Sequence, residues 1–166
     1  MNRVSNERVA QLNRELNIAK ARNASLSETR KIEDEILAER TKAHNKSVGF
    51  YGQELDDLEA NRAKLKQLND MLVQLNNAKA RGDKKVYIDV DLDGKIDKVK
   101  VDEAIEAVQG QIDNTGRAVD IAVNLKTEGA DLDAERKIQA AQRANENRNA
   151  AKAETDILRK AEDARI

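Results

Sequence analysis

The sequence KKVYIDVDLDGKIDKVKVDE, residues 84–103, is the part of the chain that decides the fold. It is the one stretch without a helical pattern, and it separates two long helical segments. It contains D-V-D-L-D-G, a motif that is typical both of calcium-binding loops and of turns. The two interpretations predict different folds and different functions.

The calcium interpretation rests on an EF-hand loop, which needs oxygen ligands at positions 1, 3, 5, 7, 9 and 12 and a glycine at position 6. The residues that match are Asp89, Asp91, Asp93 and Asp97, with Gly94 at position 6. Position 12, however, is Lys100, a cation where the motif requires a bidentate carboxylate. The residues before the motif also alternate as in a strand, whereas an EF-hand has an incoming helix. We therefore favour the alternative and expect no metal and no cofactor.

A β-hairpin accounts for the same residues on both faces, because Asp93-Gly94 is a favoured two-residue type I′ turn. The predicted pairs are Leu92–Lys95, Val90–Asp97, Ile88–Val99 and Val86–Val101 on one face, and Asp89–Lys98 and Tyr87–Lys100 on the other. The first face is almost entirely apolar, and the second contains an attractive charge pair. A lone hairpin is marginally stable in water, so we expect its apolar face to lie on the neighbouring helices.

The rest of the chain has the composition of long helices. Its 166 residues include no proline and no cysteine, 2% are aromatic and 37% are charged. This composition is typical of helices that pack along thin seams, although disordered chains share some of it. The 30 Lys and Arg nearly balance the 31 Asp and Glu, so we expect neither nucleic acid nor an anionic membrane as a partner. No stretch approaches the ~18 apolar residues of a membrane span.

Apolar residues at helical spacing predict two arms, residues 6–80 and 102–166, on either side of the hairpin at residues 84–101. The residues expected to form the coiled-coil seam are Leu55, Leu58, Leu65, Leu68, Leu72, Leu75, Ile105, Val108, Ile112 and Val119. Breaks are expected in the first arm near residues 25–28, with Ser27 as a weak N-cap, and near residues 49–52. Because the connection is short, we predict one elongated, mainly α domain: an antiparallel helical hairpin or coiled coil with a small β insert.

Three asparagines are candidates for setting register. Asn69 lies in the predicted seam, and Asn145 and Asn149 lie in the C-terminal tail. Buried asparagines set the register between copies of a coiled coil at some cost in stability, and the alternative is that these three lie at a seam edge. Residues 140–153 have nothing larger than alanine on their apolar stripe, and a helix without a packed face is marginal alone. We expect this tail to become ordered on a partner.

The sequence has no pattern typical of an enzyme. His44 is the only histidine, and we expect it on a solvated helical face. Acidic clusters are interleaved with lysine and arginine at helical spacing, as on the exposed faces of coiled coils. Without a phosphate-binding glycine loop, a nucleophile motif or a cysteine, we expect a non-enzymatic protein with no catalytic residues.

Three features together resemble a known family. These are LNDMLVQLNNAKARG at residues 68–82, the β-containing insert, and I-Q-x-x-Q-x-x-N-x-x-x-N at residues 138–149. They resemble the hydrophilic translocators of type III secretion, which are needle-tip and extracellular filament proteins. In that family the terminal helices form an intramolecular coiled coil around an irregular or β-containing segment. The resemblance implies a virulence-related subunit that is exported without a cleaved signal and that self-associates or docks on a needle.

Two alternatives remain open. A helical structural or scaffolding protein of a phage or another large assembly shares the charge-rich, proline-free arms, and a calcium-responsive binding module follows if the aspartates bind metal. For an assembly protein, the expected partners are further copies of the chain or other subunits. The stretch MNRVSNERVAQLNREL lacks the apolar segment of a Sec signal. This is compatible with the secretion without a cleavable signal peptide that the resemblance implies; otherwise we expect a cytoplasmic or virion-associated protein.

Overall fold

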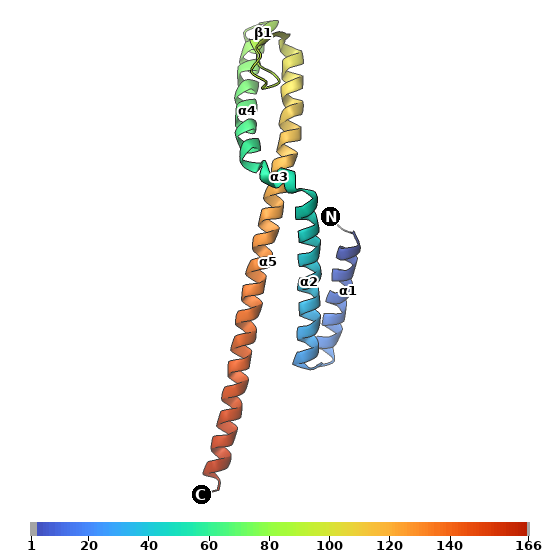
Figure 1. Cartoon of the computed structure of the whole chain (residues 1–166), viewed down its shortest axis with the longest axis vertical. Coiled ribbons are helices and arrows are strands. Elements are labelled where there is room, and N and C mark those ends of the chain that lie inside the picture. Colours follow the sequence, from blue (N-terminus) through green and yellow to red (C-terminus); the bar gives the residue numbers. More distant parts are fainter. Residues whose placement is uncertain (1–2, 166) are drawn as a thin grey trace. The chain divides into compact units, whose positions relative to one another are not determined.

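The computed structural model describes residues 3–165 and is mainly α, with long helices that pack on each other and one small antiparallel sheet (Figure 1). The elements are α1 (Arg3–Ala21), α2 (Leu26–Phe50), α3 (Gly52–Asp56), α4 (Leu58–Ala80), β1 (Lys85–Ile88), β2 (Asp97–Lys100) and α5 (Val101–Asp163). The predicted fold class is confirmed. Where we expected one domain, the chain divides into two compact units. One is Met1–Asn45 with Thr127–Ile166, and the other is Lys46–Lys126.

The first predicted break in the N-terminal arm is a complete helix end. Asn23 adopts the left-handed conformation with φ of 53°, and its N–H donates to the carbonyl of Lys20 at 3.2 Å. The N–H of Ala24 donates to the carbonyl of Ala19 at 2.9 Å. These two bonds form a Schellman motif, which satisfies carbonyls at the end of α1. The chain can then turn and start a new helix.

The start of α2 is fixed by a serine that precedes the one we predicted. Ser25 Oγ accepts the backbone N–H of Glu28 at 3.2 Å, so Ser25 and not Ser27 is the N-cap. Ser25-x-x-Glu28 is also the sequence pattern of a capping box. The second predicted break lies where α2 ends at Phe50, before the short α3 begins at Gly52.

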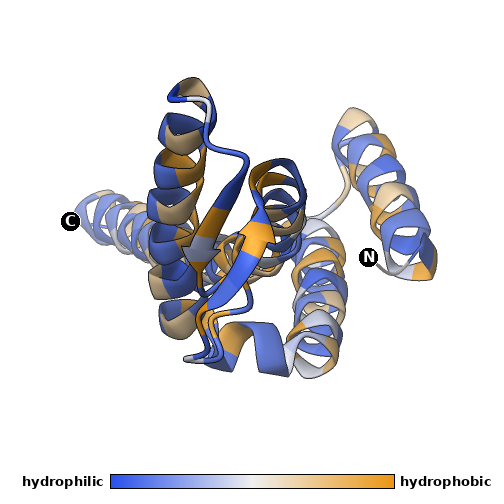
Figure 2. Ribbon diagram, turned by 90° about the horizontal axis from the view of Figure 1, so that it is seen from above, coloured by the Kyte–Doolittle hydropathy of each residue, from blue (hydrophilic) through white to orange (hydrophobic). Residues whose placement is uncertain are grey.

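The core of the Lys46–Lys126 unit is formed by α4 and the first part of α5. Leu68 and Leu75 of α4 and Ala104 and Val108 of α5 are at most 1% exposed. The residues that pack around them are Met71, Leu72, Val86, Ile88, Val90, Leu92, Val99, Ile105 and Ile112. Because these include strand and loop residues, the apolar face of the hairpin lies on the helix pair, as predicted (Figure 2).

The register of the hairpin differs from the predicted one. The observed pairs are Lys85–Lys100, Val86–Val99, Tyr87–Lys98 and Ile88–Asp97. Each partner is shifted by two residues, so the same side chains still face the helices. Val101 is released from the sheet; it begins α5 and is 2% exposed. The predicted two-residue turn is therefore wrong, and the connection runs from Asp89 to Ile96.

Backbone N–H groups that donate to one aspartate explain the longer connection. Asp89 accepts the backbone N–H of Asp93 on Oδ1 at 3.1 Å and that of Gly94 on Oδ2 at 2.8 Å. Gly94 has φ of 84°, a conformation that favours glycine. Gln111 of α5 donates its side-chain amide to the carbonyl of Val90 at 2.8 Å. Such local side-chain bonds compete with strand pairing, and here they hold the loop.

The other unit is formed by α1, α2 and the second part of α5. Its buried apolar residues include Leu12 and Ala19 of α1 and Leu132 of α5. α2 has no fully buried residue. Ile32, Ile36 and Leu37 of α2 are half-buried, and polar side chains of α2 contact α5.

Candidate interaction surfaces

Arg143 of α5 makes the densest set of polar contacts with α2. Its Nη1 donates to Asp34 Oδ1 at 2.6 Å, and its Nη2 donates to the carbonyl of Arg30 at 3.2 Å and lies 3.5 Å from Glu33 Oε2. Burial acts to lower the pKa of the Arg143 guanidinium, but the hydrogen bonds and charges of Asp34 and Glu33 outweigh it and raise the pKa. The guanidinium therefore stays charged and holds the two helices together.

Two further arginines extend these contacts along the same pair of helices. Arg30 Nη2 donates to Glu146 Oε2 at 2.8 Å, and Arg40 forms an ion pair with Glu135. The partner number on α5 falls as the number on α2 rises, so the helices run antiparallel. Arginine–carboxylate pairs with a fixed hydrogen-bond geometry set the register of the two helices as well as adding attraction.

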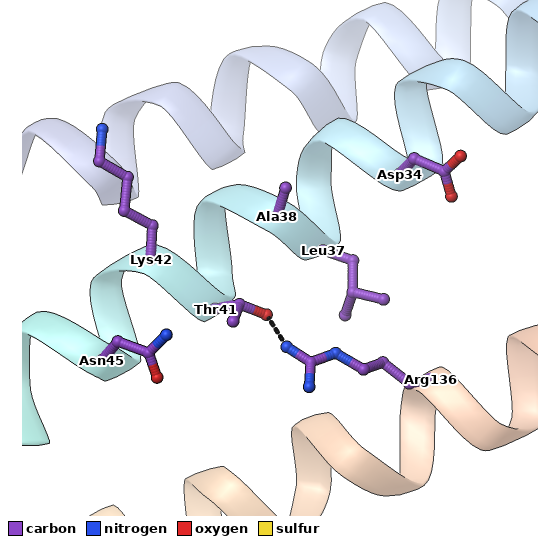
Figure 3. Close-up of a pocket in the computed structure, with 7 residues that line it drawn as sticks. All are labelled: Asp34, Leu37, Ala38, Thr41, Lys42, Asn45 and Arg136. Atoms are coloured by element: carbon purple, nitrogen blue, oxygen red, sulfur yellow. Dashed lines mark hydrogen bonds between the residues drawn. The ribbon is translucent and has the colours of Figure 1, made fainter.

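A groove of about 570 Å³ lies along α2 (Figure 3). It is lined by Asp34, Leu37, Ala38, Thr41, Lys42, Asn45 and, from α5, Arg136. Arg136 Nη2 donates to Thr41 Oγ1 at 2.6 Å, so the one hydroxyl in the lining is already engaged. The groove therefore offers a contact surface of mixed apolar and polar side chains.

The side chain of His44 on α2 packs against α5. The prediction that it lies on a solvated helical face is therefore wrong. Its side chain is 13% exposed, and its Nδ1 lies 3.5 Å from Glu128 Oε1. The ring also lies against Gly129, where an added Cβ would be 3.0 Å from Nε2. α5 continues as helix through Gly129, so this glycine makes room for the ring and does not end the helix.

The predicted seam residues all pack within the chain. The buried ones are Leu58, Leu68, Leu75 and Val108, and the half-buried ones are Leu55, Leu65, Leu72, Ile105, Ile112 and Val119. The four buried side chains are therefore closed to another copy, whereas the half-buried ones keep part of their surface exposed. Asn69, Asn145 and Asn149 are exposed, so none of them lies in the intramolecular seam. A role for them between copies stays a prediction.

Two of the four aspartate candidates for calcium accept hydrogen bonds within the loop. Asp89 accepts two backbone N–H groups, and Asp93 Oδ1 accepts the N–H of Lys95 at 2.9 Å. Asp91 and Asp97 are exposed. Within residues 3–165, no group of three or more His, Cys, Asp or Glu side chains is placed to hold a metal ion.

The most exposed helical segment is the C-terminal part of α5. Every residue from 144 to 165 is exposed, including Ile157 at 67% and Leu158 at 60%. α5 nevertheless extends to Asp163. A helical segment such as this one, which has no packed face, is only marginally stable in water. Contacts with another molecule would supply the missing stabilisation.

No family model, curated protein or solved structure matches this chain. None of the helices in the described part of the chain has the length and apolar content to cross a bilayer. The function must therefore be inferred from the surfaces described above.

Proposed function

We propose that this protein is a non-enzymatic structural subunit that self-associates through its helices, and that it serves as a tip or filament subunit of a type III secretion apparatus. The exposed helical tail at residues 144–165 is the observation that supports self-association most directly. The secretion role is supported by the resemblance at residues 68–82 and 138–149.

The closed core limits which surface can form the assembly. Leu68 and Val108 are fully buried between α4 and α5, so opening that pair would cost much of the core of its unit. A subunit with a closed intramolecular seam keeps its own fold while another surface binds. The tail is one such surface, because its apolar residues are exposed.

The charges of the tail suit contact between identical copies. Residues 144–165 contain five acidic and five basic side chains, with the two signs interspersed. Identical tails therefore carry no net charge that would repel them. Small residues such as Ala150, Ala151 and Ala153 would allow close approach of helices, and Ile157 and Leu158 would supply apolar contact.

Self-association is tested by sedimentation velocity from micromolar to millimolar concentration. We expect the mass of the chain to rise with concentration and the double variant Ile157→Ser with Leu158→Ser to associate much more weakly. The control Ile138→Ser also exposes a hydroxyl in place of an exposed isoleucine, and it should associate normally. Equal association of all three proteins would contradict a tail interface.

The secretion role needs a separate test in cells. A strain lacking the gene should fail to translocate effectors, and the unmodified gene should restore translocation. Normal translocation in the deleted strain would count against the secretion role while leaving self-association untouched.

A further inference from the structure

The outward face of the hairpin has unbalanced positive charge. Lys85, Lys98 and Lys100 are exposed on this face together with Tyr87, which is 74% exposed. Lys85 is directly opposite Lys100, and like charges in that relation destabilise a strand pair. Lys98 Nζ lies 5.7 Å from the Tyr87 ring centre, and none of the three lysines has an ion-pair partner in the described part of the chain. An anionic surface placed here would relieve the repulsion.

A groove of mixed polarity adjoins this charged face, and Gln74, Asn77, Arg81 and Asp83 are among the residues that line it. It has a volume of about 490 Å³, and its lining includes Leu75 and Ala78 of α4, Val86 and Ile88 of β1, and Lys85 and Tyr87. β1 pairs with β2 alone, so its other edge borders this groove. The combined surface fits a partner that presents an apolar side chain next to carboxylates.

The same unit presents an exposed apolar side chain next to carboxylates around α3. Phe50 is 79% exposed, and its ring packs edge-on to Tyr51 with centres 4.8 Å apart. Glu54 and Asp56 follow on α3, and neither has an ion-pair partner among residues 3–165. Exposed aromatic side chains of this kind are frequent anchors of protein interfaces. The segment containing Phe50, Glu54 and Asp56 is called here the acidic corner.

The acidic corner and the hairpin cannot meet within one copy. α4 separates them and has 23 residues, which corresponds to about 34 Å at 1.5 Å per residue (Figure 1). Any contact between the two surfaces must therefore join different copies.

We propose that the Lys46–Lys126 unit binds a second copy of this chain head to tail, with Phe50 in the hairpin groove and Glu54 and Asp56 facing Lys85 and Lys100. This inference rests on the proposed self-association and names one contact that forms it. The contact is heterologous, so a bound pair as a whole still presents one free hairpin surface and one free acidic corner. Such contacts continue into a chain of copies unless the rotation closes a ring.

A charge exchange between the two surfaces tests the proposal. The first variant combines Lys85→Glu with Lys100→Glu, and the second combines Glu54→Lys with Asp56→Lys. In either variant alone the two surfaces carry like charge, and we expect at least tenfold weaker association by sedimentation velocity in low salt. An equimolar mixture restores opposite charges at every contact, so we expect association to recover.

Matched controls separate this effect from general charge and from misfolding. Lys66→Glu with Lys137→Glu makes the same change in net charge at exposed helical positions and should associate as the unmodified chain does. Phe50→Ala changes no charge and should weaken association. Circular dichroism of each variant checks that helix content is retained. Association of the first charge variant at full strength, or failure of the folded mixture to recover, would overturn the proposal.

The tail variant separates this inference from the tail interface. If Ile157→Ser with Leu158→Ser associates normally while the charge exchange behaves as expected, the head-to-tail contact stands and the tail interface fails. If the tail variant is monomeric and the charge exchange has no effect, the tail interface stands and the head-to-tail contact fails. A chain that stays monomeric at millimolar concentration would overturn both.

Discussion

The imidazole of His44 on α2 occupies the space where a side chain at Gly129 on α5 would lie: a Cβ there would be 3.0 Å from Nε2. None of the other glycines has an atom within 4 Å of an added Cβ, leaving aside the backbone of its own helix. A glycine inside a helix costs about 1 kcal/mol relative to alanine. The contact with His44 gives a physical reason for accepting that cost at this position.

The coupling of these two residues is testable by a double-mutant cycle. Gly129→Ala should stabilise the unmodified chain by less than the roughly 1 kcal/mol expected from helix propensity, because the methyl group crowds the ring. In a His44→Ala background the same change should give the larger gain. Gly116→Ala, which has open space around it, serves as the control in both backgrounds. Equal effects of Gly129→Ala in both backgrounds, measured by urea denaturation, would contradict the contact.

Arg143 should contribute more to stability than other arginines of α5. Arg143→Met removes the bonds to Asp34 and Glu33 and should cost about 1–2 kcal/mol, since the side chain is only 24% exposed. Arg148→Met at an exposed position should be nearly neutral. Urea denaturation of the two variants measures the difference. A similar loss for both would show that the Asp34 and Glu33 contacts are weak.

The same variant gives a prediction for pH. A raised pKa means that the folded state binds the proton of Arg143 more tightly than the unfolded state does. The resulting stabilisation is fully present below the ordinary pKa of arginine and is lost only in strong alkali. We therefore expect the stability difference between the unmodified chain and Arg143→Met to be constant from pH 7 to 10. A steady fall of the difference across that range would contradict this assignment.

Sequence pattern predicted the faces of the hairpin but not its turn. Alternation has a period of two, and the observed register is shifted by two, so Val86 and Ile88 keep their predicted side. The turn depends on which hydrogen bonds Asp89 makes and on whether Val90 packs on the helices. The bonds of Asp89 are local and compete with the two-residue turn, whereas the packing of Val90 depends on the tertiary structure.

Contacts between residues far apart in the chain could not be predicted from the sequence pattern either. His44 meets α5 at Glu128 and Gly129, and a single histidine on a helix carries no signal of such a partner. The positive charge on the outward face of the hairpin was not predicted, for a related reason. The predicted register placed Tyr87 opposite Lys100, and only the observed pairing brings Lys85 and Lys100 together. Ser25 is different, because its capping-box pattern with Glu28 was readable from the sequence.

The aspartate loop should respond unequally to removal of its carboxylates. Asp89→Ala leaves the N–H groups of Asp93 and Gly94 without their acceptors and should cost about 1–3 kcal/mol. Asp91→Ala at an exposed position should have little effect. Urea denaturation compares the two variants. A calcium loop would need both aspartates as ligands, and we expect no calorimetric response to millimolar Ca²⁺. A saturable heat of binding that both substitutions abolish would support the calcium hypothesis instead.

The central claim is that residues 144–165 become a stable helix through contact with other copies. Amide hydrogen exchange of the full chain, followed by mass spectrometry at micromolar and at millimolar concentration, tests it most directly. We predict fast exchange of this segment in dilute solution and strong protection when concentrated, while residues 101–126 are protected at both concentrations. The same exchange rate in residues 144–165 at both concentrations, whether fast or slow, would contradict the claim.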